Sequence, residues 1–186
     1  MKAERGDTMS EWNKPGLPHK GWTCVDVIDL AEGIDETESI PYEQCEMCGN
    51  EKIRYAHVMS HPDYPDEIYV GCVCAEKMTG DYVNPRRCEN ELRNRAQRRK
   101  NFKKAQWRFN PAKGTYSKKY KGEYITIMQS RYGGWGVFFA GQRVWEFDGK
   151  KIRSFEEAEN VAFYIFEEYH TTREEREAEY YRNMPY

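Results

Sequence analysis

The chain lacks a long apolar run. None of its 186 residues lies in a stretch that approaches the roughly 18 consecutive apolar residues needed to cross a bilayer. Its first residues, MKAERGDTMSEW, also lack the apolar core of a secretory signal peptide. These absences predict a cytoplasmic protein without a membrane partner, in a compartment where thiols stay reduced and clustered cysteines bind metal rather than form disulfides.

The sequence also lacks the common catalytic motifs. It has no phosphate-binding glycine loop, no Gly-x-Ser-x-Gly elbow and no His-Glu-x-x-His pair. Apolar residues are limited to 39%, against 32% charged, and aromatic residues make up 15%, so rings are expected to do much of the packing. The sequence therefore assigns no catalytic residue and leaves enzymatic activity open.

Four of the six cysteines are closely spaced, as Cys45-x-x-Cys48 and Cys72-x-Cys74. Two thiolates separated by two residues can close on one tetrahedral ion, and a second close pair can complete the coordination. Gly49 suits the tight turn that such a knuckle needs. We therefore predict a structural Zn²⁺ site formed by Cys45, Cys48, Cys72 and Cys74.

The fourth ligand has an alternative in His57. Cys72 can join the site if the backbone bends between it and Cys74, whereas His57 can join only if its strand side chain faces the knuckle. The remaining cysteines, Cys24 and Cys88, are expected to be small buried hydrophobes.

The string CEMCGNEKIRYAHVMSHPDYPDEIYVGCVCAEKM resembles a group of uncharacterised bacterial and phage proteins with the pattern C-x-x-C-G, I-R-Y-x-H and V-G-x-x-C-A. The resemblance covers residues 45–108 and implies a zinc-binding treble clef with no established activity. Cys45, Cys48 and Cys74 recur in that pattern. Strands over 53–59 and 67–70 and a short helix over 71–78 are expected within it.

Positive charge is concentrated in residues 84–121, which contain fourteen Lys/Arg and two Asp/Glu, whereas residues 1–83 contain seven and seventeen. Asn84-Pro85 predicts the start of a helix that runs to about Arg108, with an N-cap followed by proline at the first helical position. Such a block indicates nucleic-acid binding, unless the protein's own acidic parts neutralise it. The predicted contacts are Arg95, Arg98, Arg99, Lys103, Lys104, Trp107, Lys118 and Lys119.

The last third of the chain predicts a meander of strands over 123–129, 135–139 and 143–147, and then a helix that a Ser154-Phe-Glu-Glu157 capping box starts. A three-stranded sheet followed by a helix resembles the arm-type DNA-binding domain of phage integrases. This implies a DNA-facing sheet with Arg131, Trp135, Arg143 and Trp145, although strand aromatics are more often core residues.

The predicted fold class is α+β, with a treble-clef zinc module, a basic connecting helix and a three-stranded antiparallel sheet with a C-terminal helix. The predicted segments are an N-terminal arm and short strand (1–40), the zinc module (41–83), the basic helix and loop (84–121) and a β-β-β-α module with an acidic helical tail (122–186).

Three functions are compatible with these features. The leading hypothesis is a small zinc-containing protein that binds DNA or RNA, such as a phage or mobile-element accessory factor. The second is a protein-interaction module, an inhibitor or adaptor of a nucleic-acid-processing or defence complex, whose acidic surfaces meet a basic protein partner. The third is a metal-dependent nuclease that uses His57, His61 and Asp63.

Overall fold

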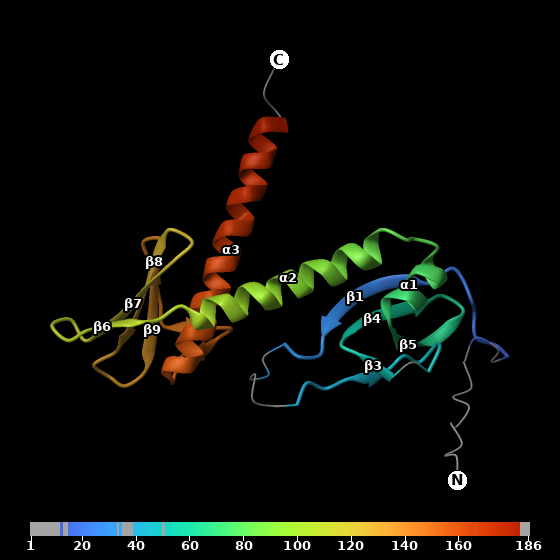
Figure 1. The fold of residues 1–186 in the computed structure, drawn as a ribbon, viewed down its shortest axis with the longest axis horizontal. Helices are drawn as coiled ribbons and strands as arrows, with labels where there is room; N and C mark the ends of the chain where they lie inside the picture. The colour runs from blue at the N-terminus through green and yellow to red at the C-terminus, as the bar shows by residue number, and fades with distance from the viewer. Residues whose placement is uncertain (1–11, 13–14, 33, 35–38, 50, 183–186) are drawn as a thin grey trace, which may run out of the picture. The chain divides into compact units, whose positions relative to one another are not determined.

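The chain divides into two units, residues 1–96 (unit 1) and 97–186 (unit 2), as the computed structural model shows (Figure 1). The structure describes residues 12, 15–32, 34, 39–49 and 51–182. Within these ranges the protein is mixed α+β, as the sequence predicts, with three helices and several antiparallel sheets. No helix in the described ranges is long and apolar enough to cross a membrane.

Unit 1 contains a three-stranded antiparallel sheet and a short helix. The sheet has the order β1-β4-β5 and is formed by β1 (Thr23–Asp29), β4 (Tyr55–His61) and β5 (Tyr64–Val70). A separate two-stranded ladder joins β2 (Glu43–Gln44) to β3 (Glu51–Ile53). Helix α1 (Cys72–Thr79) follows β5 directly and ends at Gly80, whose φ of 74° is the left-handed cap that glycine adopts without strain.

Unit 1 has a buried core of its own. Trp22, Met59, Val70 and Met78 are among its buried side chains, and the thiols of two cysteines lie in the same cluster. The Trp22 indole N–H donates to the carbonyl of Pro18 at 2.7 Å, so this ring brings a satisfied polar group into the core. Cysteine therefore takes part in the packing of this unit.

Helix α2 (Asn84–Lys104) begins within one residue of the start that the Asn84-Pro85 pair predicts and ends four residues before Arg108. The Asn84 side chain is not the cap, because it donates to Asp81 Oδ2 at 2.5 Å, and Asp81 Oδ1 accepts from the backbone N–H of Asn84 at 3.0 Å. The division between the units falls within it, so its first part belongs to unit 1 and its last part to unit 2.

Unit 2 contains a five-stranded antiparallel sheet in the order β10-β9-β8-β7-β6. Its strands are β6 (Arg108–Asn110), β7 (Thr115–Tyr120), β8 (Glu123–Gln129), β9 (Trp135–Phe139) and β10 (Gln142–Val144). The sequence predicts β8 and β9 with these bounds. It misses β6 and β7, and the strand expected over 143–147 is divided between β10 and β11 (Glu146–Phe147), which pairs with β12 (Lys150–Lys151).

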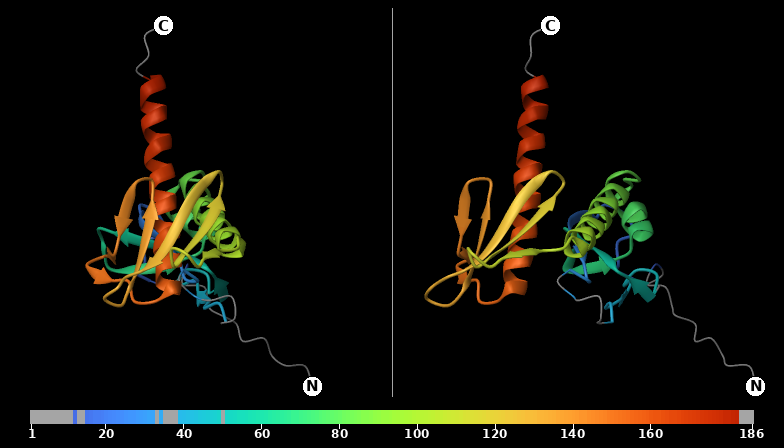
Figure 2. Two further views of the ribbon diagram at one scale, coloured as in Figure 1. Left: turned by 90° about the vertical axis from the view of Figure 1, so that its left-hand side faces the viewer. Right: turned by 60° about the vertical axis from the view of Figure 1, so that its left-hand side comes forward.

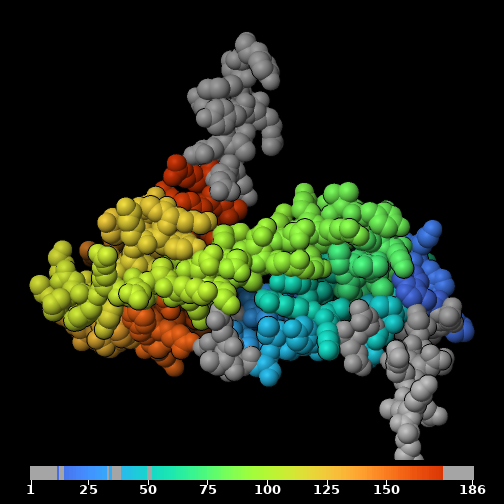
Figure 3. Space-filling view, viewed as in Figure 1, coloured from blue at the N-terminus to red at the C-terminus, as the bar shows by residue number. Residues whose placement is uncertain are grey.

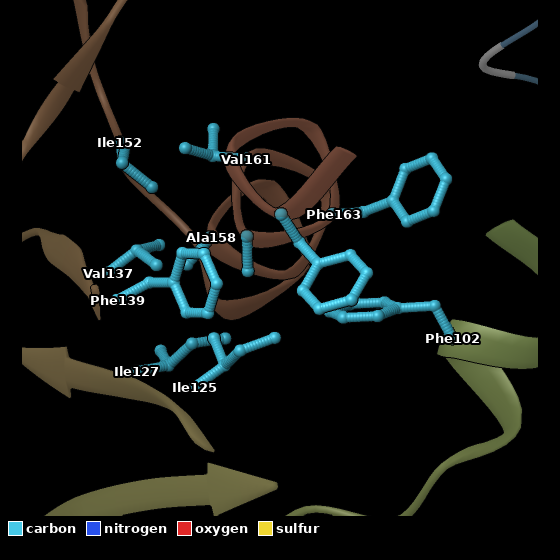
Figure 4. Close-up of a cluster of buried hydrophobic side chains, with 11 residues drawn as sticks. Phe102, Ile125, Ile127, Val137, Phe139, Ile152, Ala158, Val161 and Phe163 are labelled. Atoms are coloured by element: carbon cyan, nitrogen blue, oxygen red, sulfur yellow. The ribbon is translucent and has the colours of Figure 1, made fainter. Parts of the chain in front are cut away.

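Helix α3 (Phe155–Arg182) lies along one face of this sheet (Figure 2). Side chains of β8 and β9 face α3 in a buried cluster that Phe102 of α2 completes (Figure 4). The helix begins as its capping box predicts, since the backbone N–H of Glu157 donates to Ser154 Oγ at 3.0 Å.

Lys118 lies in this core rather than on the surface, with 2% of its area exposed. Its Nζ donates to the carbonyl of Phe102 at 2.7 Å and to Glu159 Oε1 at 3.0 Å, and burial lowers the pKa of Lys118 while Glu159 opposes that shift. The Trp107 indole also donates to Glu159 Oε1, at 2.7 Å. The assignment of Lys118 and Trp107 to a nucleic-acid surface is therefore corrected, because both serve the core around Glu159.

Replacing Glu159 by alanine is expected to destabilise unit 2 by on the order of 3 kcal/mol, because it leaves the buried Lys118 charge without its carboxylate. Lys118→Met, which removes the charge itself, should cost less. Glu156→Ala, which removes an exposed carboxylate in the first turn of the same helix, is the control and should cost less than about 1 kcal/mol. Urea unfolding measures all three, and equal losses for Glu159→Ala and Glu156→Ala would contradict the account.

Candidate metal centres

Three cysteines of unit 1 form one group. Cys45 and Cys48 come from the turn after β2, and Cys74 comes from the first turn of α1. Their sulfur atoms all lie within 4.8 Å of one another. The backbone N–H of Gly49 donates to the Cys45 carbonyl at 2.8 Å and closes the turn. The structure thus brings together three of the four predicted zinc ligands.

The surroundings of Cys45 favour a thiolate. The Cys74 thiol and the backbone N–H of Gly71, which is 3.4 Å from Cys45 Sγ, are placed to donate to this sulfur and lower the pKa of Cys45 to about 5. The same bond to Cys45, together with burial, raises the pKa of Cys74, which retains its proton. A divalent cation would replace that proton, and a set of sulfur ligands suits zinc.

Cys72 does not lie with these three cysteines. The chain is already helical at Cys72, and residues two apart on a helix point in different directions, so Cys72 and Cys74 diverge. Cys72 Sγ instead forms a second group with ring and carboxylate atoms of His57 and Glu89, all within 4.8 Å of one another. Both residues considered for the fourth zinc position are therefore in this second group.

Glu89 is a member that the sequence analysis missed. It lies on α2, and the only signal was that Glu89 and Glu91 are the two carboxylates among residues 84–121. Burial raises the pKa of Cys72 to about 11, and the nearby carboxylates of Glu89 and Glu76 contribute to that rise.

His61, a candidate in the nuclease hypothesis, has a structural role. Its Nδ1 accepts a hydrogen bond from the backbone N–H of Asp63 at 3.0 Å, so its Nε2 is left to donate to the Lys20 carbonyl at 3.1 Å. Both ring nitrogens hold backbone groups, and neither is left for a metal ion.

The basic residues of α2 are largely engaged within the protein. Arg95 pairs with Glu32 at 3.0 Å, Arg98 pairs with Glu167 at 2.5 Å, and Arg99 donates to Asn160 at 3.1 Å. Lys103, Lys104 and Lys119 are exposed. Much of the positive charge of α2 is therefore neutralised by acidic residues of the protein itself, which is the alternative to nucleic-acid binding.

Cys48→Ser is expected to release about one equivalent of zinc and to lower the melting temperature by roughly 10 °C or more, because structural zinc contributes directly to folding free energy. Elemental analysis and thermal circular dichroism measure these changes. Cys88→Ser is the matched control, since Cys88 belongs to neither group. An unchanged zinc content in Cys48→Ser would exclude Cys48 as a ligand.

No family model, curated protein or solved structure matches the chain. The function must therefore be argued from its side chains.

Proposed function

We propose that the chain is a small zinc-containing protein that binds single-stranded nucleic acid on the face of the unit 2 sheet opposite α3. The zinc would be held by the Cys45, Cys48 and Cys74 group in a treble-clef module. The observation that carries the proposal is the composition of this sheet face, which combines exposed rings with basic side chains.

A continuous row of side chains crosses all five strands on this face. Register places Arg108 opposite Ser117, Ser117 opposite Thr126, Thr126 opposite Phe138, and Phe138 opposite Arg143. Directly paired residues share a face, and neighbouring strands are about 4.8 Å apart, so the row spans roughly 19 Å. Two guanidinium groups at its ends flank two hydroxyl groups and a ring.

Three aromatic side chains add stacking surface. Tyr124 is 67% exposed, Trp145 39% and Phe138 36%. The Trp145 ring lies over Gly136, at the position that a Cβ on this glycine would occupy, so the glycine allows the ring to cover the sheet. The segment that carries β7 and β8 is exposed in the space-filling view (Figure 3).

The charge on this face is of one sign. The Nζ of Lys119 lies 5.6 Å from the Tyr124 ring centroid, and the Arg143 guanidinium lies 5.9 Å from that of Phe138. The described strand residues that point to this face include no Asp or Glu, and Arg108, Lys119 and Arg143 form no ion pair with a described residue. Cations beside rings suit a polymer that alternates phosphates and bases.

Single strands fit this face better than duplexes. Exposed rings gain binding energy by stacking on unpaired bases, which a duplex does not offer. Such stacking tolerates any base, so weak sequence preference is expected.

Tyr124→Ala and Phe138→Ala are each expected to weaken binding of a labelled single-stranded oligonucleotide by about 1–3 kcal/mol, because each removes one stacking ring. Changing Arg108, Lys119 and Arg143 together to Gln should reduce the salt dependence of log affinity by a slope of about 2, since each phosphate contact on a single strand contributes about 0.7. Fluorescence anisotropy at several salt concentrations measures both effects.

Lys103→Gln combined with Lys104→Gln is the matched control, because both lysines are exposed on α2 and lie outside the sheet face. It should leave the affinity nearly unchanged. Binding that depends on these two lysines and not on the rings would assign the contact to α2. Failure of the wild-type chain to bind at low salt would refute the proposal and favour the protein-interaction module.

A further inference from the structure

His57 is a buried histidine with one unpartnered nitrogen. Its side chain lies on β4 with 0% of its area exposed, and its Nε2 has no hydrogen-bond partner among the residues that the structure describes. A buried polar atom without a partner costs free energy of about 1–3 kcal/mol, so it calls for a ligand.

The contacts of Cys24 favour the tautomer of His57 that carries its proton on Nδ1. The Cys24 thiol donates to the Asp26 carbonyl at 3.4 Å, so its sulfur is free to accept from His57 Nδ1, which is 3.8 Å away. With the proton on Nδ1, the lone pair of Nε2 points to the other side of the ring. Metal-binding histidines are oriented in this way, by a hydrogen bond from the nitrogen that does not bind the ion.

Glu89 faces that lone pair. Its Oε2 is 3.9 Å from His57 Nε2, while its Oε1 accepts a hydrogen bond from Arg93 Nη2 at 2.7 Å. Arg93 thus orients the carboxylate and leaves one oxygen directed at the ring. Cys72 Sγ completes the group, and because Cys72 and Glu89 are only partly buried, solvent can reach it.

We propose that His57 Nε2, Cys72 Sγ and Glu89 Oε2 bind a second zinc ion, separate from the ion of the Cys45, Cys48 and Cys74 group. Zinc takes nitrogen at about 2.0 Å, oxygen at about 2.1 Å and thiolate sulfur at about 2.3 Å, which sets tetrahedral ligands roughly 3.3–3.8 Å apart. The observed 3.9 Å between nitrogen and oxygen needs only a small contraction.

The chemistry of the group supports zinc over the hard cations. Imidazole and thiolate are poor ligands for Mg²⁺ and Ca²⁺, whereas a nitrogen, sulfur and oxygen set is typical of Zn²⁺. One thiolate and one carboxylate neutralise a divalent charge in a partly buried place. Three protein ligands leave a fourth position for water, the arrangement found in zinc sites that exchange ligands.

The test is the zinc content of the full chain, saturated with Zn²⁺ and then freed of excess metal. The wild type should hold about two equivalents, and His57→Ala, Cys72→Ser and Glu89→Gln should each hold about one. Glu91→Gln is the matched control, because this exposed carboxylate lies two residues away on the same helix and should leave two equivalents in place. In the cobalt-substituted protein, Cys72→Ser should remove about a quarter of the thiolate charge-transfer intensity, one of four sulfurs.

Two equivalents in the saturated wild type would support the proposal even if a variant fails to fold. A single equivalent that folded Cys72→Ser retains would overturn it, because that ion would then belong to the Cys45, Cys48 and Cys74 group. Two equivalents retained by folded Glu89→Gln or His57→Ala would exclude that residue and the site as described. Loss of both ions from folded variants of either group would show one shared site instead. None of these outcomes depends on nucleic-acid binding.

Discussion

The start of α1 determines how the thiols of unit 1 are grouped. Strand β5 ends at Val70, Gly71 is the N-cap, and the chain is helical from Cys72 onward. On a helix the side chains of Cys72 and Cys74 are about 200° apart, so they cannot converge on one ion. Cys74 therefore joins the knuckle, and Cys72 is directed to the ring of His57. A helix that began two residues later would allow the single four-cysteine site that the spacing predicts.

Local patterns were sufficient to predict several of the regular elements. The alternation in 123–129 and 135–139, the Asn84-Pro85 helix start and the glycine after α1 each have a cause within a few residues. Strands β6 and β7, which the sequence misses, lack such a cause. β6 (RFN) has only three residues, and β7 (TYSKKY) places Lys118 at the centre of its inward face, where the partner Glu159 lies 41 residues away in the sequence. Sequence spacing cannot predict such a pair, because the two residues come together only in the tertiary fold.

Partners that are distant in the sequence also explain why the sequence predicts nucleic-acid contacts for arginines of α2 that pair within the protein. Charge density identifies residues 84–121 correctly as basic but does not show where the opposite charges lie. Arg98 meets Glu167 of α3, 69 residues away, and Arg95 meets Glu32 of the acidic N-terminal segment. Arg108, Lys119 and Arg143 form no ion pair with a described residue, and they lie on a sheet whose existence was only partly predicted. For a chain of small net charge, the face on which a cation lies therefore says more about its partner than the number of cations.

The two units differ in what holds them together, and this bears on the separation of metal binding from nucleic-acid binding. The buried cluster of unit 2 contains Phe102, Phe139, Phe163 and Phe166 with aliphatic neighbours, and no residue of either metal group belongs to this unit. Its sheet face is thus supported by apolar burial. Unit 1 has two thiols within its buried cluster, where metal coordination would add to the apolar contribution. The metal ions would therefore act on the fold of unit 1, while the exposed rings and cations of unit 2 rely on packing against α3.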